Sequence, residues 1–143
     1  MVDKDVVFEK IGQIQNGLRR IQERTQGSSE SLHDIDTQDI FVLNLQRAVQ
    51  SCIDLAAHII ADEGLGLPAD LKENFLLLER AGLIRAAVSE RLQKMVGFRN
   101  IAVHDYTAID VTVLRAVLAN NLRDLEEFYS AVLQHFHLSD PAA

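Results

Sequence analysis

The chain has 143 residues, of which 48% are hydrophobic and 24% charged, and this length and composition are typical of one ordinary soluble domain. No apolar run approaches the roughly 18 to 20 residues needed to span a bilayer, and the acidic N-terminus does not resemble a secretory signal. The net charge of −7 argues against broad non-specific binding to DNA, RNA or anionic membranes. The single cysteine, Cys52, excludes an internal disulfide and fits a reducing, cytoplasmic location.

Apolar residues spaced by three and four positions predict helices, starting with one from about Asp3 to Thr25. The polar segment GSSESLHDID then predicts a loop. Asp36 or Thr37 can cap a second helix, whose apolar stripe runs to Ile59. Glycines and Pro68 end that helix.

Three further helices are predicted in the second half of the chain. They are a short helix from about Ala69 to Arg80, a fourth that begins near Arg85, and a fifth that begins after Asp110 and carries one apolar stripe to Phe136. Nothing shows the period-two alternation of a strand. The prediction is an all-α up-and-down bundle of four long helices plus one short helix, a single domain over residues 1–143 with its core at about 3–136 and a frayed C-terminal tail.

Charge is unevenly distributed along the chain. Seven basic and three acidic residues lie between Arg80 and Arg123, a local charge of +4, so the rest of the chain sums to −11. Such a basic sector could receive a polyanion or an acidic partner, or it could be a solvated helix face.

Several kinds of site are excluded by the sequence. One cysteine rules out thiolate clusters, and neither HExxH nor an EF-hand loop is present, so no metal is predicted. The GLGLP segment lacks the pattern of a phosphate-binding loop, so no nucleotide cofactor is predicted either. Cys52 lies on the apolar stripe of the second helix and is interpreted as a packing residue.

The segment KMVGFRNIAVHDY concentrates reactive side chains within eight residues: Arg99, Asn100, His104, Asp105 and Tyr106. Arg99 continues the apolar spacing of the fourth helix, which aims a permanent cation at the bundle or its edge. That placement is costly unless the charge is paired or awaits an anion.

Helical geometry constrains how these residues can cooperate. On a continuous helix Asn100 and His104 share a face, and Arg99 and Tyr106 nearly share another, but Arg99 and His104 lie about 140° apart. If both serve one site, the helix must end between them or two chains must build the site. The alternative is a structural helix terminus, where Arg99 pairs with an acid and His104 complements the helix dipole.

The segment RNIAVHDY resembles the R-x4-6-H motif of HEPN domains, small helical bundles found in ribonuclease toxins. The longer form R-x4-H-x-Y, which ends at Tyr106, resembles HepT-type toxins of HepT/MntA toxin–antitoxin pairs. The segments NLQRAVQSCIDLAAHII and NNLRDLEEF also resemble HepT-type sequence, so the resemblance covers roughly residues 3 to 136.

The resemblance implies a metal-independent endoribonuclease that acts as a homodimer, with its cleft where the two motifs meet. Arg99 would bind the scissile phosphate of RNA and His104 would move protons, with Asn100 and Tyr106 in support, while the role of Asp105 stays open. It also implies an MntA-like nucleotidyltransferase antitoxin that transfers AMP to Tyr106. Two alternatives remain, a non-catalytic HEPN module that binds a nucleotide or a protein, and a plain helical interaction protein.

Overall fold

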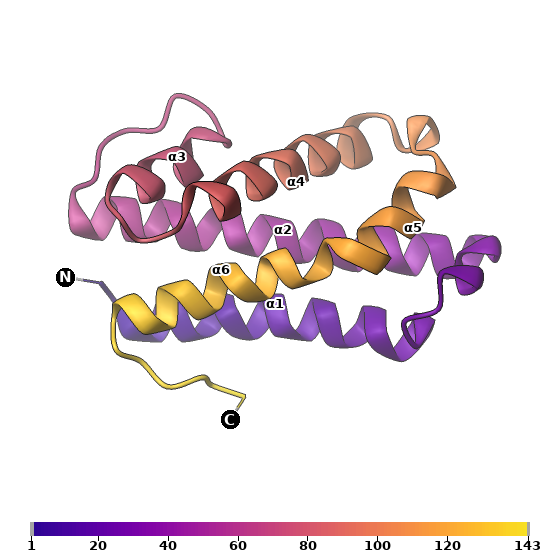
Figure 1. The fold of residues 1–143 in the computed structure, drawn as a ribbon, viewed down its shortest axis with the longest axis horizontal. Coiled ribbons are helices and arrows are strands. Elements are labelled where there is room, and N and C mark those ends of the chain that lie inside the picture. Colours follow the sequence, from indigo (N-terminus) through magenta and orange to yellow (C-terminus); the bar gives the residue numbers. More distant parts are fainter. Residues whose placement is uncertain (1, 143) are drawn as a thin grey trace.

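The computed structural model describes residues 2–142, and these residues form helices and turns without any strand (Figure 1). Six α-helices follow in chain order: α1 (Lys4–Thr25), α2 (Ile35–Glu63), α3 (Glu73–Arg80), α4 (Ala86–His104), α5 (Val111–Asn120) and α6 (Leu122–His135). Two short 3₁₀ turns are η1 (Ser29–His33) and η2 (Tyr106–Ala108). The predicted all-α bundle is confirmed.

The long helices α1 and α2 form a hairpin and pack along their lengths. The stripe predicted for α1 is confirmed, because Val7, Ile11, Ile14 and Ile21 are all fully buried. Gly17 lies where α1 packs tightly against α2. A β-carbon at this position would lie 3.1 Å from the carbonyl oxygen of Asn44 and 3.2 Å from the β-carbon of Ala48.

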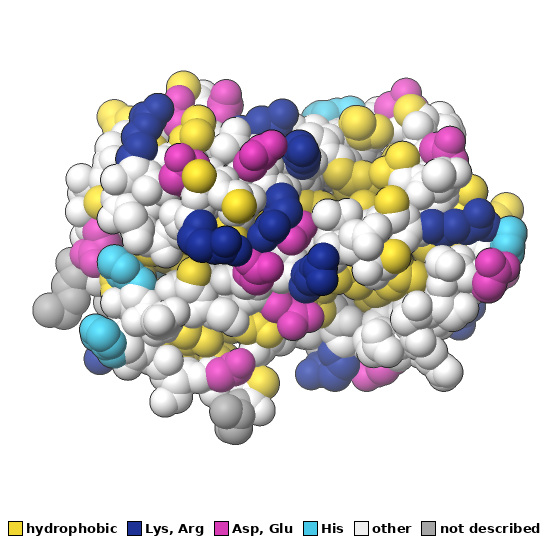
Figure 2. All heavy atoms as spheres, in the orientation of Figure 1, with side chains coloured by type: hydrophobic (Ala, Val, Ile, Leu, Met, Phe, Trp, Pro, Cys, Tyr) yellow, Lys and Arg dark blue, Asp and Glu magenta, His cyan; other side chains and the backbone are white. Residues whose placement is uncertain are grey.

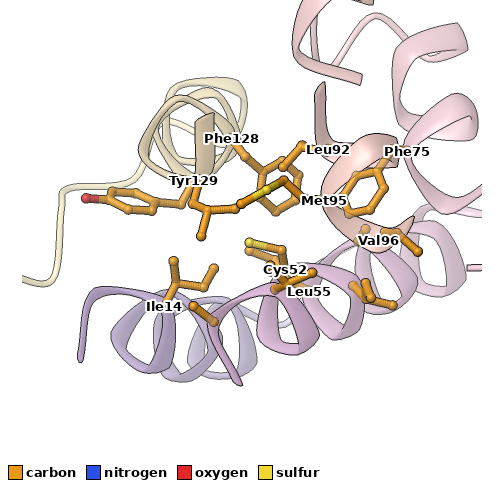
Figure 3. Close-up of a cluster of buried hydrophobic side chains, with 14 of the residues drawn as sticks. Ile14, Cys52, Leu55, Phe75, Leu92, Met95, Val96, Phe128 and Tyr129 are labelled. Atoms are coloured by element: carbon orange, nitrogen blue, oxygen red, sulfur yellow. The ribbon is translucent and has the colours of Figure 1, made fainter. Parts of the chain in front are cut away.

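One hydrophobic core joins the hairpin to α3, α4 and α6, and Figure 3 shows side chains from all five helices meeting in it. The rings of Phe75 on α3 and Phe128 on α6 meet edge to face, with centroids 5.5 Å apart. Cys52 lies fully buried beside this cluster, and its burial raises the pKa of the thiol. The interpretation of Cys52 as a packing residue is confirmed.

The start of α2 differs from the prediction. Asp34, not Asp36 or Thr37, is the N-cap, because its carboxylate accepts hydrogen bonds from the backbone N–H and the hydroxyl of Thr37 at 3.0 and 2.8 Å. These bonds lower the pKa of Asp34. The predicted polar loop before this cap contains η1, whose Leu32 is fully buried.

The predicted fifth helix is two helices, and the prediction of a continuous one is wrong. Asn121 separates α5 from α6, with φ −115° and ψ −11°. Its N–H bonds to the carbonyl of Val117, and its amide donates to the carboxylate of Asp124 at 3.1 Å. One intervening residue leaves the apolar stripe unbroken, so periodicity alone cannot reveal the break. The third helix is also shorter than predicted and begins at Glu73, whose N–H is accepted by Asp70 at 2.8 Å.

The arrangement brings distant parts of the chain together at one end of the bundle. The C-terminal end of α4, η2, the start of α5, η1 and the start of α2 lie at this end, which is on the right in Figure 1. The N-terminus lies at the opposite end. Within residues 2–142, no helix is long and apolar enough to cross a membrane.

Candidate active site

Helix α4 carries most of the motif and continues without interruption to His104, where the N–H of Asp105 bonds to the carbonyl of Ile101. The hypothesis that the helix ends between Arg99 and His104 is therefore wrong. The two residues stay about 140° apart around the helix and about 7.5 Å apart along its axis. If Arg99 and His104 serve one site, two chains remain as the way to build it.

Arg99 is half-buried and has an unusual set of neighbours. Its Nη1 donates a hydrogen bond to Oδ1 of Asn100 at 3.1 Å, and its Nε is buried without a hydrogen-bond partner. No carboxylate among residues 2–142 forms an ion pair with this guanidinium. The structural interpretation in which Arg99 pairs with an acid is thus wrong, and the guanidinium keeps donors for an external anion.

Lys72 is a second cation beside α4, and sequence reasoning missed it. It lies against the face of Gly97 and Asn100, whereas Arg99 lies about 160° around the helix from Gly97. A pocket of about 330 Å³ is lined by Lys72, Asn100, Asp70, Leu71 and Val96. The Nζ of Lys72 lies 3.7 Å from the position that a β-carbon on Gly97 would occupy, one turn before Asn100. Lys72 belongs to the segment before α3, so no spacing in the motif could have indicated it.

His104 and Tyr106 lie at the exposed end of the motif. His104 is the last residue of α4, and Tyr106 begins η2 rather than extending the helix. The predicted sharing of a helix face by Arg99 and Tyr106 is therefore wrong. The carboxylate of Asp105 accepts the hydroxyl of Thr107 at 2.9 Å, which ties it into the turn between these elements.

The phenol of Tyr106 donates a hydrogen bond to the carboxylate of Asp39 on α2. Partial burial, together with the hydrogen bond to Asp39 and its negative charge, raises the pKa of Tyr106 to about 12. Tyr106 is still 42% exposed. Sequence reasoning missed Asp39, because this contact joins positions that are 67 residues apart.

Part of the basic sector is neutralised by α6. Arg85 and Arg91 form ion pairs with Glu127 at 2.9 and 3.0 Å, and Arg91 also pairs with Asp124 at 2.9 Å. Figure 2 shows Lys and Arg side chains interleaved with Asp and Glu on one face of the bundle. The local charge of +4 thus overstates the positive surface, since it leaves out the acids of α6. Arg99 is among the cations of the sector that lack a carboxylate partner.

Exposed apolar side chains accompany the motif. Ile101 and Val103 on α4 are 49% and 42% exposed, and Leu43 on α2 and Val113 on α5 are exposed to a similar degree. Apolar surface of this kind is typical of a protein–protein contact. Within the part of the chain that the structure describes, no group of three or more His, Cys, Asp or Glu side chains could hold a metal ion.

The family model described as Ribonuclease HepT-like matches residues 14–132. The chain belongs to this family. The HepT-like chain is 38% identical over 128 residues to the mRNA nuclease HepT of Shewanella oneidensis. The matched region covers 90% of this chain and 96% of that protein. The resemblance inferred from the motif is thereby confirmed, and the enzyme class is that of a ribonuclease.

Solved structures agree with this assignment. A crystal structure of a toxin–antitoxin with AMP-PNP matches the HepT-like chain with a TM-score of 0.86 and 37% identity, over 91% of this chain and 98% of that one. A tri-AMPylated Shewanella oneidensis HEPN toxin in complex with an MNT antitoxin matches with a TM-score of 0.85 and 38% identity, over the same shares of the two chains. The fold of this chain is therefore that of HEPN toxins.

Proposed function

We propose that this protein is the toxin of a toxin–antitoxin pair. In this proposal it is a metal-independent endoribonuclease that acts as a homodimer, and an MntA-like nucleotidyltransferase silences it by transferring AMP to Tyr106. The observation that carries the proposal is the state of Arg99, a half-buried guanidinium held by Asn100 with no carboxylate partner among residues 2–142. In a member of a ribonuclease family, the anion that such a group awaits is the RNA phosphate.

The proposed reaction uses the RNA itself as nucleophile. The ribose 2′-oxygen attacks the adjacent phosphorus and gives up its proton, the bond from phosphorus to the 5′-oxygen breaks, and that oxygen receives a proton. His104 moves protons, because an imidazole ring can both accept and donate a proton. Arg99 holds two non-bridging oxygens as charge develops on them, and Asn100 orients the guanidinium. The products are a 2′,3′-cyclic phosphate and a 5′-hydroxyl.

Lys72 adds a second positive charge on the face of α4 that carries Gly97 and Asn100. It lies across α4 near Asn100, where it can contact a neighbouring phosphate of the bound strand. Its role in the proposal is substrate binding rather than chemistry, because it is exposed and tethered by a flexible side chain.

The site in this proposal is composite. Arg99 and His104 point about 140° apart on one continuous helix, so one copy supplies the arginine and its partner supplies the histidine. Exposed Ile101 and Val103 on the same turns support pairing through this end of the bundle. A two-fold axis then produces two equivalent sites.

Control through Tyr106 is supported by accessibility. The chain has two tyrosines, and Tyr129 is only 9% exposed, whereas Tyr106 is 42% exposed. One solved neighbour is a tri-AMPylated HEPN toxin in complex with an MNT antitoxin. AMP on Tyr106 would place a bulky, negatively charged group at the end of α4, where it would compete with RNA for the cations.

The test is RNA cleavage by the purified protein in excess EDTA, with the product ends identified. We expect cleavage in chelator, 2′,3′-cyclic phosphate ends, and losses of about 10²- to 10³-fold in Arg99→Ala. His104→Ala should lose RNA cleavage activity to a similar extent. Arg80→Ala is the matched control, because Arg80 is exposed and has no carboxylate partner among residues 2–142.

Complete loss of cleavage in EDTA, or undiminished cleavage by His104→Ala, would contradict the mechanism. RNA binding without cleavage by the unmodified protein would favour the non-catalytic HEPN module instead.

A further inference from the structure

Asp39 is the one described residue that hydrogen-bonds to the phenol of Tyr106. It lies in the second turn of α2, on a different element from the motif, and reaches η2 across the end of the bundle. Its carboxylate forms no ion pair with any cation in residues 2–142. An exposed carboxylate that is free of cations and bonded to a phenol is an unusual neighbour for a modification site.

Nucleotidyl transfer to a phenol requires a group that takes up the phenolic proton. When a phenol attacks phosphorus, its proton must leave, and at neutral pH the raised pKa of Tyr106 keeps almost all of this phenol protonated. A general base within hydrogen-bond reach typically contributes 10²- to 10⁴-fold to such a step. In the free toxin the carboxylate of Asp39 already accepts the hydrogen bond from this hydroxyl.

We infer that Asp39 is a catalytic residue for the modification of Tyr106. As the phenolic oxygen attacks the α-phosphorus of ATP, the Asp39 carboxylate takes the phenolic proton. The bond from oxygen to the α-phosphorus forms, the bond from that phosphorus to the bridging oxygen breaks, and pyrophosphate leaves. The toxin thus supplies the base for its own silencing, and the partner nucleotidyltransferase supplies the bound ATP. This inference rests on the proposed function, in which Tyr106 accepts AMP.

The contact between Tyr106 and Asp39 also predicts that the Tyr106 side chain moves away from Asp39 after AMP is attached. Once AMP is attached, the oxygen of Tyr106 has no proton to donate, and the new phosphodiester carries a negative charge. An ionised carboxylate beside it would repel that charge. The modified side chain therefore leaves Asp39, which frees it to occupy the surface near the end of α4.

A base can be distinguished from a residue that merely holds the tyrosine. Asp39→Asn keeps the shape and an oxygen that can accept the phenolic hydrogen bond, but an amide cannot take up the proton. Asp39→Glu keeps the carboxylate on a longer side chain. If Asp39 only positions Tyr106, AMP incorporation should be faster in the Asn variant than in the Glu variant. If Asp39 is the base, incorporation should be faster in the Glu variant.

The experiment measures the single-turnover rate of AMP incorporation from ATP labelled at the α-phosphate, in the complex of the full-length toxin with its nucleotidyltransferase. We expect a loss of about 10²-fold in Asp39→Asn and a smaller loss in Asp39→Glu. Affinity for the nucleotidyltransferase and the thermal unfolding midpoint should change little. Asp36→Asn is the matched control, because Asp36 is an exposed carboxylate in the first turn of α2 with no bond to Tyr106.

Two outcomes separate the inference from the proposal beneath it. If Tyr106→Phe abolishes incorporation while Asp39→Asn stays within about threefold of the unmodified chain, Asp39 is not the base, because a base is worth far more than that. If Tyr106→Phe still takes up AMP, the acceptor itself is wrong and the proposed control through Tyr106 fails.

Discussion

Arg99 is stabilised by an amide rather than by an opposite charge, and this distinguishes it from Arg91, the other arginine of α4. Arg91 pairs with Asp124 and Glu127, so its charge is neutralised within the fold. Within residues 2–142, the guanidinium of Arg99 bonds to the side-chain oxygen of Asn100 alone, and its Nε has no hydrogen-bond partner. A partly buried cation in this state costs free energy in the free protein, and in the proposed function the RNA phosphate would offset that cost.

The planar guanidinium of Arg99 should be essential for RNA cleavage, so a substitution that keeps only the positive charge should lower the cleavage rate. Arg99→Lys replaces a planar pair of donors by a single ammonium, which cannot hold two phosphate oxygens at once. We expect cleavage to fall by about 10²-fold with no loss of folding. Arg123→Lys is the control, because Arg123 is exposed and forms no ion pair within residues 2–142. Equal activity in Arg99→Lys would show that charge alone suffices.

The environment of Tyr106 also makes a pH-dependent contribution to folding. Its pKa is about 12 in the folded chain against an ordinary 10.0, so the folded state favours the protonated phenol. The contribution is fully present below pH 10 and is lost as the pH rises through 12. Asp39→Asn removes the carboxylate's charge, so the folded-state pKa should fall, the contribution should become smaller, and its loss above pH 10 should be complete at a lower pH. The measurement is the absorbance of tyrosinate together with the unfolding midpoint across this range, with Tyr106→Phe as the control that lacks the group.

At the scale of elements, the sequence predicts helices from their apolar periodicity. It does not reveal a local break in a helix or a contact between residues distant in the chain. The apolar stripe of α1 is buried as predicted because packing of a helix depends on spacing. The break at Asn121 was missed because one residue of altered backbone preserves that spacing. The motif residues could be found because they are adjacent in the chain. Lys72 and Asp39 could not, because only the tertiary fold brings them to α4 and η2.

Two glycines of α1 should respond oppositely to the same substitution. Gly12 has no atom within 4 Å of an added β-carbon, so Gly12→Ala should stabilise the chain by about 0.5–1 kcal/mol through helix propensity. At Gly17 the new methyl would press on the backbone of Asn44 and the β-carbon of Ala48, so Gly17→Ala should destabilise it by about 1 kcal/mol or more. Urea unfolding of both variants gives the free energies, and a stabilised Gly17→Ala would contradict the close packing of α1 on α2.

At the scale of the whole molecule, Arg85 and Arg91 are paired with acids of α6, whereas Arg99 in the second half of α4 has no carboxylate partner among residues 2–142. The chain as a whole is acidic, with a net charge of −7, so in the proposed function RNA would be attracted by a few local cations. The proposed cations are Arg99 and Lys72, which lie on different faces of α4, and a second copy of the chain would double their number. Pairing through the motif end would therefore both complete the site and strengthen its positive field.

The composite site can be tested by mixing two inactive chains. In the proposed homodimer, Arg99→Ala and His104→Ala would each destroy both sites, but a mixed dimer would join Arg99 of the second variant to His104 of the first. After subunit exchange, half of the dimers are mixed and each has one intact site, so about a quarter of the unmodified activity should return. Light scattering should show dimers throughout, and Ile101→Asp, which charges the exposed apolar surface, should yield folded monomers without activity. No recovery despite proven exchange would place the whole site within one chain and overturn the composite arrangement.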